Sequence, residues 1–134
     1  MSTSFASAPK ILVADDDDQI LEFVETILNA EGYQTIRAKD GKEAYKLLQS
    51  KEHYDAAILD IMMPYIEGGD LLKFMQTEKR FMRIPVIITT GDPSPRLSSS
   101  SFAAGAVAFL PKPFTAPQLT SMLRMCIRSN GAKK

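Results

Sequence analysis

Three aspartates, a threonine and a lysine follow apolar segments of this sequence, although they lie far apart along the chain. Asp15 and Asp16 follow the run KILVA, and Asp60 ends the run DAAILD. Thr90 ends IPVIITT, and Lys112 comes shortly after AVAFL. Three carboxylates gathered in one place favour a hard, oxygen-coordinated divalent cation. Mg²⁺ suits this set, because it binds few protein ligands and keeps several water molecules. The residues therefore predict a magnesium site, provided that the fold brings them together.

The same residues also suit the chemistry of an aspartyl phosphate. A carboxylate beside a bound cation can act as a nucleophile toward phosphorus, and Asp60 is the predicted nucleophile. The ammonium of Lys112 and the hydroxyl of Thr90 are suited to phosphoryl oxygens, whose charge they would neutralise in the transition state. Thr89 competes with Thr90 for this role, and the strand register together with the following Gly91 favours Thr90.

The stretch ILVADDDDQI places four aspartates side by side, which needs a physical reason. Two carboxylates ~4 Å apart repel each other by roughly 1 kcal/mol in water and roughly 4 kcal/mol near a protein surface. Asp17 or Asp18 can cap the helix predicted to follow, where a negative charge meets the helix dipole favourably. This division of roles leaves Asp15 and Asp16 for the cation.

The apolar pattern predicts strands that alternate with helices. Strands are expected at 10–14, 33–38, 55–60, 84–90 and 106–110. Helices are expected between the aspartates and Gly32, and at 41–50, 70–79 and 116–129. Such alternation predicts an α/β fold with a doubly wound, five-stranded parallel sheet and helices on both faces. Ligands of these sheets bind at the carboxyl ends of the strands, where the polar residues named above are expected to converge.

The segment between the last two predicted strands, GDPSPRLSSSSFAAG at 91–105, is a poor candidate for a helix. It contains Pro93, Pro95 and four consecutive serines, 98–101. Proline breaks a helix interior, and serine offers the backbone competing hydrogen bonds. We expect the fourth helix to be short, displaced or mobile.

Length and composition limit the remaining possibilities. A chain of 134 residues fits one domain, predicted at 10–130 between a mobile tail at 1–9 and a short tail at 131–134. Acidic and basic residues number 16 each, so no overall charge recruits nucleic acid or an anionic membrane. The single cysteine, Cys126, suits a packing role in a reducing compartment, and the cytoplasm is the expected location. The only histidine, His53, is expected to be an exposed loop residue.

Four segments carry a resemblance to a known family: ILVADDD, AAILDIMMPYIEGGDLL, IPVIITTG and GAVAFLPKPF. In this order and spacing they resemble a bacterial response-regulator receiver domain, from Lys10 to about Asn130. The resemblance implies a flavodoxin-like sheet with strand order 2-1-3-4-5 and five flanking helices. It also implies that Asp60 accepts a phosphoryl group from a sensor histidine kinase, a histidine phosphotransfer protein or a small phosphodonor.

The resemblance assigns roles to further residues of the site. Asp16 would bind Mg²⁺ directly, Asp15 would help through water, and the backbone carbonyl of Met62 would be another ligand beside Asp60. Lys112 would pair with the phosphoryl group, and the peptide bond between Lys112 and Pro113 is expected to be cis.

The same resemblance places Thr90 and Phe109 at the switch positions of the family. On phosphorylation the Thr90 hydroxyl would move toward the new oxygens, and the Phe109 ring would turn inward. The surface of helix four, strand five and helix five would then change shape for a downstream protein target.

Two other functions remain as alternatives. The chain could be a receiver-like scaffold that docks partners without phosphorylation. It could also be a small-molecule phosphatase, but such enzymes need an acid two places after the nucleophile, where this chain has Met62. We therefore expect a switch that assists its own phosphorylation and dephosphorylation, and not an enzyme. No output-domain pattern follows residue 130, which predicts a stand-alone receiver, as a monomer or weak dimer.

Overall fold

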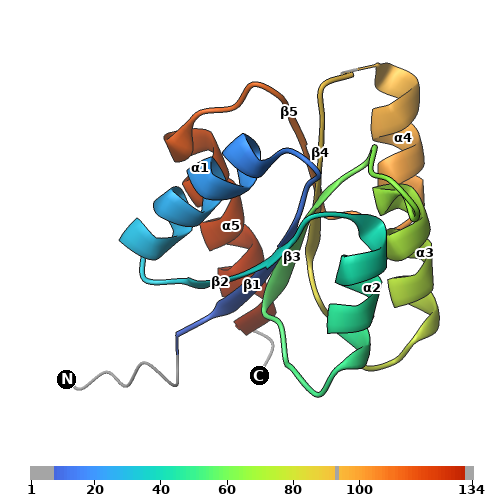
Figure 1. The fold of residues 1–134 in the computed structure, drawn as a ribbon, viewed down its shortest axis with the longest axis horizontal. Coiled ribbons are helices and arrows are strands. Elements are labelled where there is room, and N and C mark those ends of the chain that lie inside the picture. Colours follow the sequence, from blue (N-terminus) through green and yellow to red (C-terminus); the bar gives the residue numbers. More distant parts are fainter. Residues whose placement is uncertain (1–7, 93, 132–134) are drawn as a thin grey trace.

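The computed structural model describes residues 8–92 and 94–131, in which five strands alternate with five helices (Figure 1). The strands are β1 (Lys10–Ala14), β2 (Gln34–Ala38), β3 (Ala56–Asp60), β4 (Val86–Thr90) and β5 (Ala108–Pro111). The helices are α1 (Asp18–Ala30), α2 (Gly41–Gln49), α3 (Gly68–Thr77), α4 (Pro95–Ala103) and α5 (Ala116–Gly131). The predicted tails, 1–9 and 131–134, lie mostly outside the described residues, and Pro93 lies wholly outside them.

The five strands form one parallel sheet in the order β2-β1-β3-β4-β5, which confirms the predicted fold class. The central strands β3 and β4 are buried along their whole length, as expected for strands covered on both faces. In the register of the sheet, Asp60 lies opposite Thr89, and Thr90 lies opposite Pro111. The carboxyl ends of β3, β4 and β5 therefore meet at one edge.

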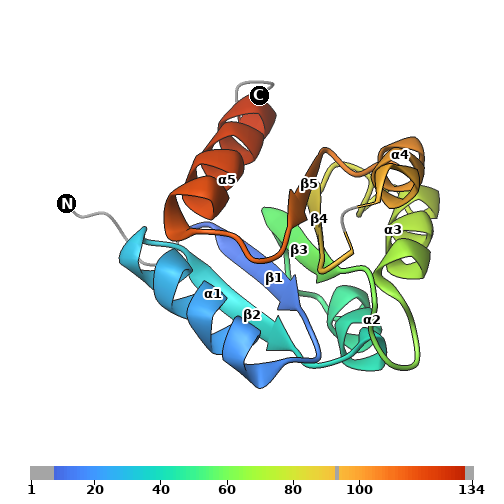
Figure 2. The same cartoon turned by 90° about the horizontal axis from the view of Figure 1, so that it is seen from above.

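Two apolar clusters lie on the two faces of this sheet. Helices α1 and α5 cover one face (Figure 2), where Leu28 and Leu119 pack against Ile11 and Ile58. Helices α2, α3 and α4 cover the other face, where the cluster includes Leu48, Leu72 and Met75. This layered packing holds the strand ends rigidly, so side chains at those ends have defined positions.

The helix beginnings explain part of the aspartate run. The Asp17 carboxylate accepts a hydrogen bond from the Gln19 backbone N–H at 2.9 Å, so Asp17 is the cap of α1 and Asp18 is the first helical residue.

Helix α5 begins with two reciprocal hydrogen bonds between Thr115 and Gln118. There the Thr115 hydroxyl accepts from the Gln118 N–H at 3.3 Å, and the Gln118 side chain accepts from the Thr115 N–H at 2.8 Å.

Helix α4 is better formed than its composition suggests, which corrects part of the prediction for 91–105. Pro95 is its first residue, where no N–H is needed, so proline starts this helix and does not break it. The hydroxyl of Ser94 caps the helix by accepting from the Leu97 N–H at 3.2 Å. The helix is short, with 9 residues against 16 in α5, and its mobility stays a prediction.

The beginning of α3 lies against the end of β3 at Gly68. A Cβ atom at Gly68 would come within 2.3 Å of the Asp60 carbonyl oxygen, whereas a Cβ at Gly69 meets nothing within 4 Å. Gly68→Ala is therefore expected to lower the free energy of unfolding by about 1–3 kcal/mol, because the backbone beside Asp60 must shift. The matched control Gly69→Ala should be neutral or stabilising by up to about 1 kcal/mol, because alanine favours the helix. Chemical denaturation measures both, and equal effects of the two substitutions would contradict the close contact.

Candidate functional site

Three carboxylates meet at the carboxyl ends of β1 and β3. These strands are neighbours, and Ala14 lies opposite Leu59. Asp15 and Asp60 are the next residues along the two strands, so they lie side by side. Asp15 and Asp60 are buried, with 2% and 5% of their surface exposed, and Asp16 is exposed. One oxygen atom from each of these three aspartates lies within 4.8 Å of the others. The structure therefore brings together the three carboxylates that the sequence suggested as metal ligands.

Lys112 brings a positive charge into this acidic cluster. Its Nζ lies 2.7 Å from Asp15 Oδ2 and 3.5 Å from Asp60 Oδ2. The contact with Asp15 is a hydrogen bond between residues 97 positions apart, and the other oxygen of Asp15 accepts from the Asp17 N–H at 2.9 Å. Lys112 is thus held closer to Asp15 than to Asp60.

The electrostatic environment disfavours a charge on Asp60. Burial raises the pKa of this carboxyl from 3.8 to about 6, and the negative charge of Asp15 acts in the same direction. Lys112 and the Met62 N–H, which donates to Asp60 Oδ1 at 3.4 Å, offset only part of this rise in pKa. For Lys112, burial lowers the pKa, but the contacts with Asp15 and Asp60 outweigh it and leave the pKa raised. A shifted carboxyl in contact with a lysine is typical of functional sites.

Thr90 ends β4, the strand next to β3, and its side chain is fully buried. Its hydroxyl accepts a hydrogen bond from the Asp92 N–H at 3.0 Å, and its carbonyl accepts from the Lys112 N–H at 2.7 Å. Among the described residues, no hydrogen bond joins the Thr90 hydroxyl to Asp60. Thr89 is buried as well, and it is the residue that lies opposite Asp60 in the sheet. The structure therefore places both threonines at this edge, and the choice of Thr90 stays a prediction.

The remaining predicted residues lie around this centre. The side chain of Met62 is 60% exposed at the edge of the acidic cluster. Phe109 on β5 is half-buried against the core, and its ring centroid lies 6.4 Å from that of Phe102 on α4. The peptide bond between Lys112 and Pro113 is cis.

Residues 11–124 match the family described as the response regulator receiver domain. The chain belongs to this family. Among curated proteins, this receiver domain is 36% identical over 121 residues to a probable transcriptional regulator, ycf27, of Galdieria sulphuraria, covering 89% of this chain and 45% of that protein. It is 34% identical to the response regulator MprA of Mycolicibacterium vanbaalenii, covering 89% and 50% respectively. The chain spans about half the length of the curated relatives it matches.

Solved structures lead to the same family. The receiver domain of Francisella response regulator 1452 is 35% identical, with a TM-score of 0.84, over 90% of this chain and 98% of that one. A CheY-like receiver domain protein from Methanospirillum hungatei is 29% identical, with a TM-score of 0.88, over 96% and 100% of the two chains. Both likenesses confirm the expected resemblance and the strand order of the sheet.

The acidic cluster fits Mg²⁺, the ion that receiver domains bind in their acidic pocket. Its donors are carboxylate oxygens, the hard ligands that Mg²⁺ prefers, and the exposed Asp16 leaves one side open to the water that this ion retains. Lys112 neutralises only part of the charge of Asp15 and Asp60, so a divalent cation would relieve the remaining repulsion.

Two backbone contacts that were not predicted from the sequence help to hold the site in place. The Asp17 N–H donates to Asp15, so the helix cap also orients a predicted metal ligand. The Asp92 N–H donates to Thr90 in the same i, i+2 arrangement. The available signal was the aspartate or threonine at the strand end itself, because short polar side chains commonly accept a hydrogen bond from the backbone N–H two residues further on.

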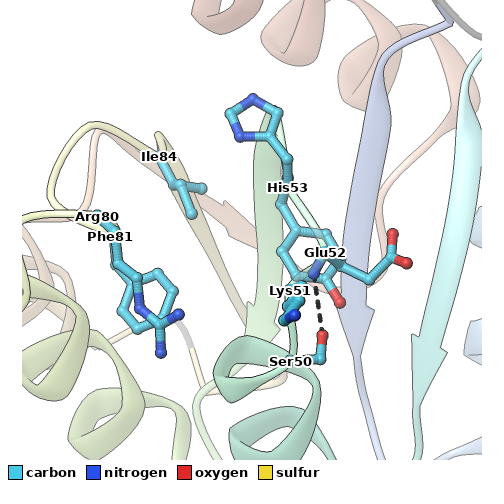
Figure 3. A pocket seen from close by; sticks show the side chains of 8 residues that line it. Ser50, Lys51, Glu52, His53, Arg80, Phe81 and Ile84 are labelled. Carbon is cyan, nitrogen blue, oxygen red and sulfur yellow. Dashed lines mark hydrogen bonds between the residues drawn. The ribbon is translucent and has the colours of Figure 1, made fainter.

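A shallow pocket of about 200 Å³ lies away from the acidic cluster, between the segments that precede β3 and β4 (Figure 3). Its lining includes Glu52, His53, Arg80 and Phe81. His53 is exposed, which confirms the loop position predicted for it, and its Nε2 lies 3.7 Å from Asp55 Oδ1.

None of the helices in the described part of the chain is long and apolar enough to span a membrane.

Proposed function

We propose that this receiver domain is a phosphorylation-dependent switch. Asp60 would take a phosphoryl group from a phosphohistidine of a sensor histidine kinase or a histidine phosphotransfer protein. The observation that carries this proposal is the position of Asp60, buried at a strand end beside Asp15, with the Lys112 ammonium 3.5 Å from its carboxylate. Receiver domains as a family take phosphoryl groups from sensor histidine kinases.

The transfer needs one bond to form and one to break. A carboxylate oxygen of Asp60 forms a bond to phosphorus, the phosphorus–nitrogen bond of the donor breaks, and the electron pair returns to the imidazole. Charge in the transition state is spread over the three phosphoryl oxygens. Lys112 would leave part of its contact with Asp15 to pair with these oxygens, and the buried position of the site strengthens that interaction.

The metal would be held by Asp15, Asp16, Asp60 and the backbone carbonyl of Met62, with Asp16 as a direct ligand and Asp15 acting through water. Bound Mg²⁺ supplies neutralising charge for the phosphoryl oxygens. These same groups would assist the later hydrolysis, so the domain would promote its own phosphorylation and dephosphorylation.

The phosphorylated form would be read by another protein. We propose that the Thr90 hydroxyl exchanges its Asp92 contact for a phosphoryl oxygen and that the Phe109 ring turns inward from its half-buried position. The surface of α4, β5 and α5 would change with them, as a shift between two packings of the domain, one of which phosphorylation stabilises more than the other.

A single cysteine suits the reducing cytoplasm, which we propose as the location.

Phosphate uptake from a small donor tests this function. Incubation of the chain with an acyl phosphate and Mg²⁺ should add one phosphate, detected by intact mass spectrometry and mapped to Asp60. Chelation of the divalent ion should slow uptake by at least about tenfold, because the carboxylates then repel the incoming anion. No uptake in the presence of Mg²⁺ would contradict the switch and favour a scaffold that docks partners without phosphorylation.

A further inference from the structure

The shallow pocket of Figure 3 lies at the opposite end of the sheet from the acidic cluster. It has a volume of about 200 Å³ and is formed by the segments 50–54 and 80–84, which lead into β3 and β4. Asp60 is the last residue of β3. Six residue steps of roughly 3.3 Å separate it from Tyr54, about 20 Å in all. A ligand in this pocket would therefore not touch the acidic cluster.

The floor of the pocket is apolar and well packed. Tyr54, Phe81 and Ile84 expose only 2%, 3% and 8% of their surface, and all three belong to the apolar cluster on the α2, α3 and α4 side of the sheet. The Tyr54 hydroxyl donates to the Leu47 carbonyl at 3.3 Å, so this polar group is already used within the protein. The floor therefore offers an apolar surface of fixed shape.

The neutral and acidic groups of the rim are also used within the protein. The Ser50 hydroxyl donates to the Leu47 carbonyl at 2.7 Å and accepts from the Glu52 N–H at 3.2 Å. Among the described residues, Glu52 is the only acid that lines the pocket, and its carboxylate is paired with Lys10. The negative charge on the rim is therefore compensated.

Two cations of the rim, Lys51 and Arg80, have no such compensation. In the described part of the chain, no ion pair joins either of them to a carboxylate. The Arg80 guanidinium lies over the Phe81 ring, with its central carbon 4.5 Å from the ring centroid. Such stacking fixes the plane of the guanidinium and leaves its N–H donors free at the edge. Figure 3 shows Arg80 and Phe81 on one side of the pocket and Lys51 and His53 on the other, so positive charge faces the pocket from two sides.

A long polyanion suits this surface less well than a small anion. Two more exposed basic residues, Lys79 and Arg83, lie close to Arg80 in the sequence, and clustered cations attract nucleic acid. Three acidic residues interrupt the same stretches of chain: Glu52, Asp55 and Glu78. An extended strand would meet repulsion from these carboxylates, whereas a small anion within the pocket meets mainly the two uncompensated cations.

A phosphate monoester that carries a planar ring satisfies both the charge and the apolar surface. Its three terminal oxygens can contact a lysine and an arginine together, whereas a carboxylate has two oxygens, which one arginine can occupy. A nucleobase can stack on the outer face of a guanidinium. The volume of about 200 Å³ lies below the roughly 300–1,000 Å³ of sites for larger ligands, so one nucleotide is the upper limit.

We infer that this pocket binds a nucleoside monophosphate. The phosphate lies between Lys51 and Arg80, the base stacks on the outer face of Arg80, and the sugar faces the open side of the pocket. This inference goes beyond the proposed switch and does not require phosphorylation of Asp60.

Titration of the full chain with adenosine monophosphate tests the inference, followed by backbone amide chemical shifts. A chelator is present throughout, so that no metal holds the phosphate at the acidic cluster. Amides of 50–54 and 80–84 are expected to shift saturably, with a Kd below about 1 mM. Adenosine and inorganic phosphate each offer only one of the two recognised groups and should bind at least about tenfold more weakly.

Several outcomes of this titration would overturn the inference. These are the absence of a saturable shift, shifts centred on the acidic cluster, and an affinity for adenosine or inorganic phosphate equal to that for the nucleotide. Tighter binding of an oligothymidylate of about 20 nucleotides would indicate a nucleic-acid surface instead. All of these comparisons use the unmodified chain, so they do not depend on whether a variant folds.

Charge reversals locate the site. Lys51→Glu and Arg80→Glu should each weaken binding of the nucleotide by at least about fivefold, because repulsion replaces a contact with the phosphate. Both side chains are exposed, so neither substitution disturbs the core. Lys73→Glu, the same reversal on the exposed surface of α3, is the matched control and should change the affinity by less than about twofold. Equal loss with Lys73→Glu would overturn the assignment to this pocket.

Discussion

Asp60→Asn is expected to abolish phosphate uptake and, in metal-free buffer, to make the protein more stable. The amide cannot act as the nucleophile, so the added phosphate should disappear from the mass spectrum. The gain in stability arises because the ionised carboxylate is buried beside Asp15. A pKa raised from 3.8 to about 6 corresponds to roughly 3 kcal/mol at neutral pH, so we expect an increase of about 1–3 kcal/mol in the free energy of unfolding.

The pH dependence of this gain follows from the sign of the pKa shift. A carboxyl whose pKa is raised on folding destabilises the folded protein when it is ionised, and the folded protein takes up its proton first as the pH falls. The advantage of Asp60→Asn should thus be full above about pH 7, shrink as the pH falls through about 6, and be lost by about pH 3, where the carboxyl is neutral in the folded and in the unfolded protein. Glu22→Gln, an exposed neutralisation on α1, is the control and should change stability by less than about 0.5 kcal/mol. A less stable Asp60→Asn at pH 7, or an undiminished gain at about pH 3, would contradict the electrostatic account.

Asp16→Asn is expected to weaken Mg²⁺ binding by about tenfold or more, whereas Asp18→Asn should have little effect. Both residues belong to the run of four aspartates, and both are exposed. Only Asp16 has a carboxylate oxygen within the cluster formed with Asp15 and Asp60, whereas Asp18 occupies the first turn of α1. The loss of a charged ligand reduces the attraction for a divalent ion, and each tenfold change corresponds to about 1.4 kcal/mol.

Calorimetric titration of Mg²⁺ into the metal-free protein measures both variants. Asp18→Asn preserves the length and polarity of the run, so any effect of overall negative charge should appear in it as well. Equal weakening by the two substitutions would show that the ion responds to general charge and not to a site formed by Asp16.

Element order and the chemistry available at the strand ends could be predicted from local patterns. The buried run before Asp15 and the β-branched run before Thr90 are strand signals that need no distant partner. Asp17, Thr115 and Gly32 marked helix ends because caps are satisfied within a few residues of the chain. Helix α4 was judged less well, because Pro95 has opposite effects inside a helix and at its first position, and composition does not distinguish the two.

Local sequence patterns were enough to predict alternating strands and helices with carboxylates, hydroxyls and a lysine at the strand ends, because periodicity and turn chemistry act over short distances. How these groups meet could be seen only in the folded chain. The pairing of Lys112 with Asp15 across 97 positions and the raised pKa of Asp60 both depend on sheet register and burial. These properties arise from contacts between distant segments, and no local pattern specifies the distance between them.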